Sequence, residues 1–566
     1  MKKTVSKIIA LVLALCLALP VMALPSFAAT QYISDEPVVE EDYTVGKTVV
    51  KVFGAVADTL ITAVSRLFPT PDWPYEDEFV SEYFYEGHKT FQKDVAENAQ
   101  WQCGFASDSI LPDDFPEKGY VAAGEFHITE TLANRILEGD DQRFSAIALD
   151  DGSGNGTVIF ASLDGFGMTS TNVRKLRSYL DSFAKENNIV SINVSISHTH
   201  SGLDTHGLGA SILGLVGDSA LYGMLRLVGI EHDFSSTDDA FMTNLFETAE
   251  AVVKTAYADL KPGTLTYNAF DISDLIYDKQ YPVVFDPNVN QIKFVPDDAQ
   301  KNEIWLVNMG VHPVKMADSA VSADYPGAIV RYAKEMVGAD VAFYQGAQLA
   351  ITREEAPLRL GEDAAYNALT DDAERRFYVV NKYGKEIVTR ILNNDPVETM
   401  AIDPILNIAH TEVKLPVGTS LLLLIAKIQM INNLVVKTSW DFTDSLVVSE
   451  VGYCELGKDL AIAIMPGEIE PAIVYGGVDG IAESWNNEAW PYAAFVNMAN
   501  KKLLTFGITN DQIGYIIPDN DYAHPFASLF EDLLGGGRNK HYEEMISLGP
   551  ETASTIAKAF RELVRK

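Results

Sequence analysis

Cysteine is nearly absent from this chain of 566 residues, which contains three. Cys16 lies in an apolar N-terminal run, which leaves Cys103 and Cys454 for the rest of the chain. So few cysteines over this length exclude a small fold held together by disulfides. The two remaining cysteines either pair outside the cell or stay as buried free thiols, and the sequence leaves both outcomes open.

Positive charge is also scarce, because 43 Lys and Arg residues face 79 Asp and Glu residues, a formal net charge of −36. Such a surface repels nucleic acids and anionic membranes and favours solubility, so we expect no nucleic-acid partner. Charge of this kind restricts the partners of a protein and says nothing about its fold.

The N-terminus lacks an apolar run long enough to span a membrane. Lys2, Lys3 and Lys7 precede an apolar core over residues 8–18, and Ser26-Phe27-Ala28 fits a small-x-small cleavage site. This pattern predicts a secretory signal over residues 1–28 and a secreted, soluble mature protein. Its oligomeric state stays open.

Beyond the signal, the pattern changes near residue 115. Residues 29–115 are acidic at first and then carry a helical apolar pattern from Val45 to Val64, typical of an accessory segment that packs on a larger domain. Residues 116–566 alternate strand and helix patterns, which predicts an α/β fold with a large mixed β-sheet and surrounding helices. The strands are expected at 144–149, 158–163, 304–311, 339–344, 460–465 and 503–508, with one more through Ile192, Val194 and Ile196, and helices at 173–183, 326–337 and 551–564.

Two features of this larger region admit a functional and a structural interpretation. The glycine-rich run 151–156 could cradle a phosphate, but a strand follows it, which favours a hairpin turn. The apolar stretches 206–230 and 415–436 are interrupted by glycines and polar residues. They are typical of buried core helices, and the alternative is the lining of a lipid site that touches a membrane surface transiently.

Histidine is scarce as well, with ten residues, yet two of them share one tripeptide, His198-Thr199-His200. Alternate residues of a strand point to the same face, so both imidazoles leave the end of an apolar strand together. Imidazole is the commonest metal ligand and proton shuttle near neutral pH.

Three more chemically useful side chains follow apolar strands: His312 in NMGVHPV, Glu468 in IMPGE and Tyr515 in GITNDQIGYI. Functional groups gather outside the carboxyl ends of strands in α/β sheets. Nitrogen ligands combined with a carboxylate suit zinc and leave room for water. The four strand ends therefore predict one metal site, although each residue alone is also common at an ordinary strand end.

Taken together, these motifs resemble the neutral, non-lysosomal ceramidase family over about residues 115 to 565, its catalytic domain without the immunoglobulin-like C-terminal domain. The family signature H-T-H-S followed by glycines matches His198 to Gly202. Further similar segments, in order, are Gly119 to Thr129, Ser162 to Asp164, His312, Pro466 to Glu468, Tyr515 and His541 to Glu543.

The resemblance implies a secreted amidohydrolase that cleaves the N-acyl bond of ceramide or a related lipid, giving a fatty acid and a sphingoid base. One Zn²⁺ per chain would be held by His198, His312, Glu468 and Tyr515. His200 would transfer a proton, and Tyr542 would polarise the amide carbonyl.

Two positions depart from the family. The family's serine in F-A-Q-S-N is replaced by Gly346, and no G-x-S-x-G elbow occurs elsewhere, which favours attack by metal-activated water. The family's arginine is replaced near Lys279, which offers charge without the bidentate guanidinium fork. Both residues are candidate substrate contacts.

Other functions stay open beside this one. A non-catalytic lipid-binding protein on a decayed enzyme fold would explain the replaced serine and arginine. A different zinc amidohydrolase could act on N-acyl amino acids. A (β/α)₈ amidohydrolase barrel would need two further strand-end histidines, and His312 is the one that fits.

Overall fold

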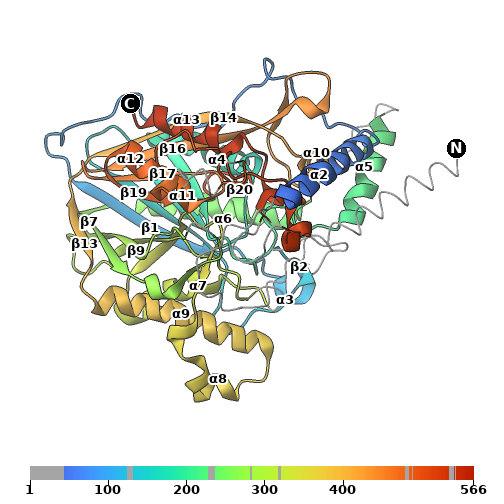
Figure 1. The fold of residues 1–566 in the computed structure, drawn as a ribbon. Coiled ribbons are helices and arrows are strands. Elements are labelled where there is room, and N and C mark those ends of the chain that lie inside the picture. Colours follow the sequence, from blue (N-terminus) through green and yellow to red (C-terminus); the bar gives the residue numbers. More distant parts are fainter. Residues whose placement is uncertain are drawn as a thin grey trace.

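The computed structural model describes residues 44–123, 132–226, 236–280, 283–316, 320–477, 484–486, 488–533, 541 and 543–566. Two twisted sheets form the centre of the molecule, and helices cover them (Figure 1). The predicted signal, residues 1–28, lies outside the described residues.

The larger sheet has nine strands in the order β11-β10-β9-β7-β1-β4-β5-β6, with β13 paired to β7. The pairs β5–β6 and β10–β11 are parallel, and their neighbours pair antiparallel. This mixed sheet confirms the predicted fold class and is incompatible with a (β/α)₈ barrel, whose strands are all parallel. The strands are β1 (Trp101–Ser109), β4 (Arg143–Asp150), β5 (Thr157–Leu163), β6 (Ile189–Ile196), β7 (Lys261–Asp271), β9 (Asn288–Pro296), β10 (Ile304–Met309), β11 (Asp340–Gln345) and β13 (Glu398–Ile402).

The second sheet has five strands in the order β14-β16-β17-β19, with β15 paired to β16. Its apolar face packs on the larger sheet, because Phe160 of β5 and Ile462 of β17 belong to one buried core. The strands are β14 (Leu406–Pro416), β15 (Val435–Lys437), β16 (Ser445–Leu456), β17 (Leu460–Ile464) and β19 (Lys502–Phe506). The short strands are β2 (Tyr120–Val121), β3 (Leu132–Ala133), β8 (Ile276–Asp278), β12 (Ile351–Arg353), β18 (Glu468–Ile469) and β20 (Tyr515–Ile516).

Helices cover the outer faces of both sheets (Figure 1). The helix α6 packs on β1 and β4, α7 packs on β11 and α9, and α13 packs on β14 and β16. The longer helices are α2 (Thr44–Ser65), α4 (Ser170–Glu186), α5 (Ile212–Arg226), α6 (Asp239–Ala258), α7 (Asp324–Val337), α9 (Asp372–Asn393), α10 (Ser420–Lys427) and α13 (Thr552–Leu563). The shorter ones are α3 (Phe115–Lys118), α8 (Ala364–Ala368), α11 (Pro471–Tyr475) and α12 (Phe495–Ala499).

The predicted strands and helices are confirmed within a few residues at each end. The glycine-rich run 151–156 joins the antiparallel strands β4 and β5, so it is a hairpin turn. Cys103 and Cys454 are buried free thiols, and burial raises the pKa of each well above the usual range. β1 lies between β4 and β7, so residues 101–109 of the predicted accessory segment belong to the main sheet.

The two apolar stretches differ in their surroundings. Within 415–436, α10 is buried in a core that also contains Ile61 of α2, because α2 packs over it. Within 206–230, α5 keeps Leu221 and Met224 exposed. Among the described residues, the segment Val45–Ser65 of α2 is long and apolar enough to cross a membrane by length and composition.

Candidate metal centre

The centre lies where four strands of the two sheets end. His198 follows β6, His312 follows β10, Glu468 begins β18 after β17, and Tyr515 begins β20 after β19. The short strands β18 and β20 pair in parallel with Glu468 directly opposite Tyr515. Residues separated by more than three hundred positions therefore meet at one edge of the fold.

His198 is held in a demanding conformation. Its φ of 68° lies in the left-handed region that non-glycine residues rarely occupy. Strain of this kind persists where the surroundings fix the residue, and it is common at functional sites. His198 Nδ1 lies 2.7 Å from the Phe166 carbonyl oxygen, which accepts its hydrogen bond, so Nε2 is left to face the centre.

His312, like His198, is oriented by a hydrogen bond from Nδ1 to a backbone carbonyl. Its Nδ1 donates to the Ile351 carbonyl at 2.9 Å, and its Nε2 lies 2.9 Å from Glu468 Oε2. His198 Nε2 lies 3.2 Å from the same carboxylate oxygen. Two imidazoles fixed through Nδ1 thus present Nε2 to one carboxylate oxygen, an arrangement typical of histidine ligands whose other nitrogen is held by a carbonyl.

Glu468 is almost fully buried. Burial raises its pKa, but His198 and His312 outweigh this effect and hold the pKa well below its usual range. Gln512 Nε2 donates to Oε1 at 2.9 Å, and the Gln348 amide lies 3.5 Å from Oε2. The carboxylate therefore stays ionised, with one oxygen tied to Gln512 and the other directed at the histidines.

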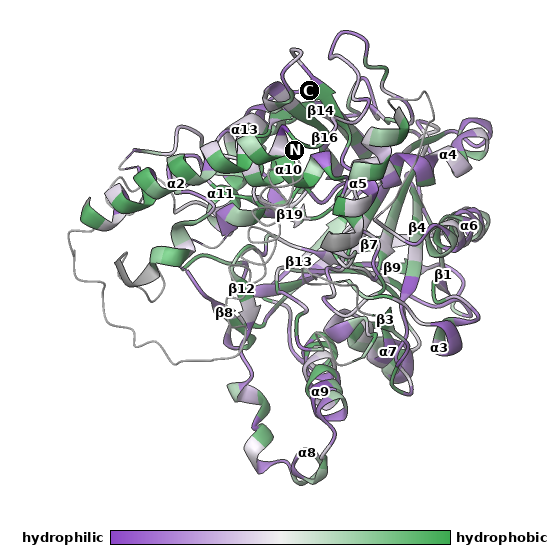
Figure 2. Ribbon diagram, turned by 90° about the vertical axis from the view of Figure 1, so that its right-hand side faces the viewer, coloured by the Kyte–Doolittle hydropathy of each residue, from purple (hydrophilic) through white to green (hydrophobic). Residues whose placement is uncertain are grey.

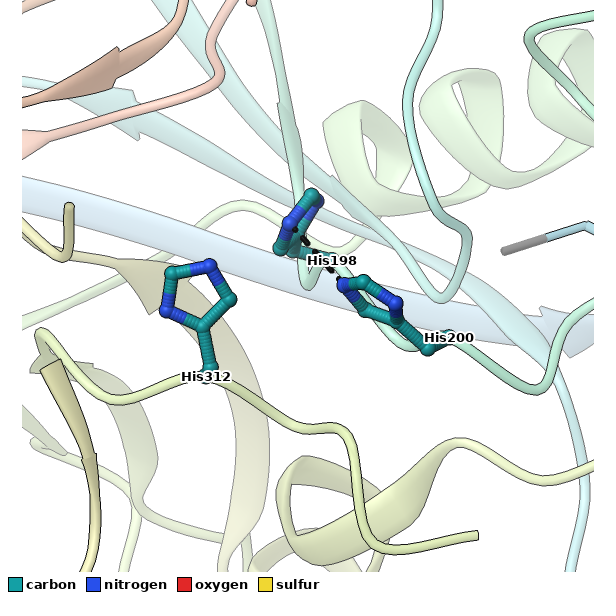
Figure 3. Close-up of side chains that lie close together, drawn as sticks. All are labelled: His198, His200 and His312. Atoms are coloured by element: carbon teal, nitrogen blue, oxygen red, sulfur yellow. Dashed lines mark hydrogen bonds between the residues drawn. The ribbon is translucent and has the colours of Figure 1, made fainter. Parts of the chain in front are cut away.

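His200 completes the cluster (Figure 3). Its Nε2 lies 3.3 Å from His198 Nε2, and the ligand nitrogens of His198, His200 and His312 lie within 4.8 Å of one another. Burial lowers the pKa of His200 well below its usual range, and the two neighbouring histidines add to this effect. His200 is therefore a neutral base beside the two imidazoles that face Glu468.

The remaining predicted site residues differ in their relation to the centre. Burial lowers the pKa values of His200 and His312, and the positive charge of Lys279 adds to this effect at both histidines. Burial raises the pKa of Tyr515 well above its usual range, and Glu468 adds to the rise. Tyr542 lies outside the described residues.

Gly346 has a structural reason to be glycine. A Cβ at this position would lie 2.8 Å from the Gly310 nitrogen, and a Cβ on Gly507 would lie 2.6 Å from the Gly346 oxygen. The strands β10, β11 and β19 therefore end in close backbone contact, without room for the serine of the family motif at 346. A contact between Gly346 and substrate stays a prediction.

Gln345 is a residue of the centre that sequence reasoning missed. Its buried Nε2 donates to the Ser197 carbonyl at 3.1 Å and to the Val311 carbonyl at 3.0 Å. These carbonyls precede His198 and His312, so one amide joins both histidine-bearing strand ends. Nothing in the sequence distinguished Gln345 from other strand glutamines.

The donor set fits a divalent cation. Two imidazole nitrogens and an ionised carboxylate oxygen converge in a buried space, with a third imidazole close to them and Tyr515 paired opposite Glu468. Nitrogen donors with one carboxylate are characteristic of zinc, and buried charge requires a compensating partner.

The same architecture occurs in solved structures. The neutral ceramidase from Pseudomonas aeruginosa matches with a TM-score of 0.56 and 14% sequence identity, over 83% of this chain and 74% of that chain. A structure described as ceramidase complexed with C2 matches with a TM-score of 0.55 and 11% identity, over 82% of this chain and 75% of that chain.

The chain has the neutral ceramidase fold. No protein-family model and no curated protein sequence matches the chain. At a sequence identity of 11–14%, the similarity is visible in the three-dimensional structure and in a few short motifs. The predicted ceramidase-like fold is confirmed.

Proposed function

We propose that this chain is a zinc-dependent amidohydrolase that cleaves the N-acyl bond of ceramide or a related N-acyl lipid. The observation that carries the proposal is the meeting of His198, His312 and Glu468 at one point within a neutral ceramidase fold. His198, His312, Glu468 and Tyr515 would hold one Zn²⁺ per chain.

A zinc ion bound there would act as a Lewis acid and lower the pKa of water towards about 7. The chain's own residues supply the proton transfer. His200 is neutral and buried, and its Nε2 lies beside His198, so it can accept a proton and return it to the leaving amine.

The substrate would be oriented by groups around the histidines. The positive charge of Lys279, which acts on His200 and His312, would suit a hydroxyl or other polar group of the lipid head. Tyr542 is proposed to donate a hydrogen bond to the amide carbonyl as negative charge develops on its oxygen. The rings of His198 and His200 pack against Phe166, which supplies an apolar wall.

The proposal is tested with a substrate panel on the purified protein. We expect release of fatty acid from ceramide, loss of that release on addition of a chelator, and recovery on addition of zinc. Release from N-acyl amino acids alone would assign a different amidohydrolase. Binding of ceramide without any release would assign a lipid-binding protein.

We also propose that residues 1–28 direct export and are removed, so that the mature chain begins at Ala29. The mass of the exported protein tests this, because retention of the first 28 residues would contradict a cleaved signal.

A further inference from the structure

The outward face of α2 is an apolar surface that none of the described residues covers. Val45, Val52, Val56 and Leu60 recur at helical spacing and are 73%, 63%, 55% and 51% exposed. Leu67, just beyond the helix, continues the line and is 54% exposed. We call these five residues the α2 stripe. Figure 2 shows α2 as hydrophobic over most of its length.

The opposite face of α2 is packed on the protein. Val50 contacts a core with Trp485 and Ala527, and Ile61 enters the core that contains α10. A helix with one face attached to a folded domain cannot insert across a bilayer, although its length and composition would allow it. Amphipathic helices of this kind lie in the plane of the membrane interface with the apolar face down.

Charge on α2 is arranged to suit such a surface. The single acidic residue of the helix, Asp58, accepts hydrogen bonds from Ser420 and His524, on the side opposite the stripe. Lys51 is exposed and, seven residues before Asp58, shares its side of the helix. On a chain with net charge −36, a face without acidic residues is where a phospholipid surface is least repelled. At physiological salt, charges beyond about 8 Å are screened.

A second copy of the chain fits this surface poorly. A helix of 22 residues is about 33 Å long, and one face about 10 Å wide offers roughly 330 Å². Stable interfaces bury about 800 Å² on each partner. A bilayer has no such minimum, because each apolar side chain partitions into it independently.

We propose that the α2 stripe docks the protein on the surface of a phospholipid bilayer. The inference goes beyond the proposed function, but it supplies what an enzyme acting on membrane lipids would need. It places membrane contact on α2, which covers the buried leucines of α10 within stretch 415–436.

The test is flotation of the purified full chain with ceramide-free phosphatidylcholine vesicles, so that its outcome does not depend on hydrolysis. We expect wild type to float and the double variant Val52→Asp/Val56→Asp to lose at least about tenfold in partition coefficient. Val397→Asp is the matched control, because Val397 is 63% exposed, as Val52 is, and precedes β13 on the far side of the molecule from α2 (Figure 1).

Circular dichroism shows whether each variant is folded, and light scattering gives the mass in solution. Failure of wild type to float, or equal flotation of the double variant, would overturn the proposal. A dimer of wild type that the double variant abolishes, without flotation, would assign the stripe to a second copy and overturn it as well.

Discussion

Two buried glutamates of this fold have opposite surroundings. Glu450 on β16 receives two hydrogen bonds from Arg177, at 2.7 and 3.0 Å, and Arg177 also donates to the Ile192 carbonyl. Glu468 contacts two imidazoles and two amides, groups that carry no fixed charge. The first carboxylate is neutralised within the protein, whereas the second is arranged for a cation. The difference separates a structural ion pair from a candidate metal centre.

The largest effect on activity is expected from His200→Ala. Removing a positioned proton-transfer group costs about 10²–10⁴-fold in turnover, and the Nε2 atoms of His198 and His312 remain in place. The amidase assay should fall by this factor while metal content stays unchanged. Loss of metal from this variant would show that His200 is a ligand.

Arg177→Met is expected to remove the structural ion pair with Glu450. It leaves the buried charge of Glu450 without a partner, which costs about 3–5 kcal/mol of unfolding free energy. Chemical denaturation measures this loss, and the folded fraction should still bind metal. As a control, Arg66→Met removes an exposed pair with Asp441, where we expect less than about 1 kcal/mol. Equal losses of unfolding free energy in Arg177→Met and Arg66→Met would contradict the structural role of the buried pair.

Gln512→Leu tests the support of Glu468. Outer groups that orient a metal ligand are worth about 10–100-fold in affinity. We expect metal affinity to fall by that factor, and to fall less in Gln348→Leu, because the Gln348 contact is 3.5 Å long instead of 2.9 Å. Competition with a chromogenic chelator measures both. A larger effect for Gln348 would reverse their assigned roles.

Asp511 is not among the proposed metal ligands, and its effect is visible in the pH dependence of stability. Burial raises its pKa to about 7, although Ser449 and Ser170 donate hydrogen bonds to it. The folded state therefore retains a proton that the unfolded state loses near pH 4, so this group's contribution to unfolding free energy declines from about pH 4 to 7.

In Asp511→Asn, that decline should disappear, and the unfolding free energy should depend less steeply on pH between about 4 and 7. Denaturation with urea at several pH values measures the slope. Asp395→Asn, which removes an exposed carboxylate, should keep the slope of wild type. An unchanged slope in Asp511→Asn would show that Asp511 ionises normally.

The sequence predicted the strand ends and the residues that meet there, because apolar strands and chemically distinctive side chains are local signals. It missed Gln345 and Gln512, since a glutamine acquires its role from distant carbonyl or carboxylate groups. It also predicted α2 as a helix without showing that its valines face outward, because periodicity marks an apolar face and not what covers that face. The glycine at position 346 could be explained only from the structure, because a Cβ there would collide with the Gly310 backbone.

The central claim is that His198, His312 and Glu468 hold a cation, and metal analysis of the purified protein tests it most directly. The account predicts one zinc ion per chain in wild type and almost none in His198→Ala or His312→Ala, with circular dichroism unchanged. Equally little metal in wild type and both variants would contradict it.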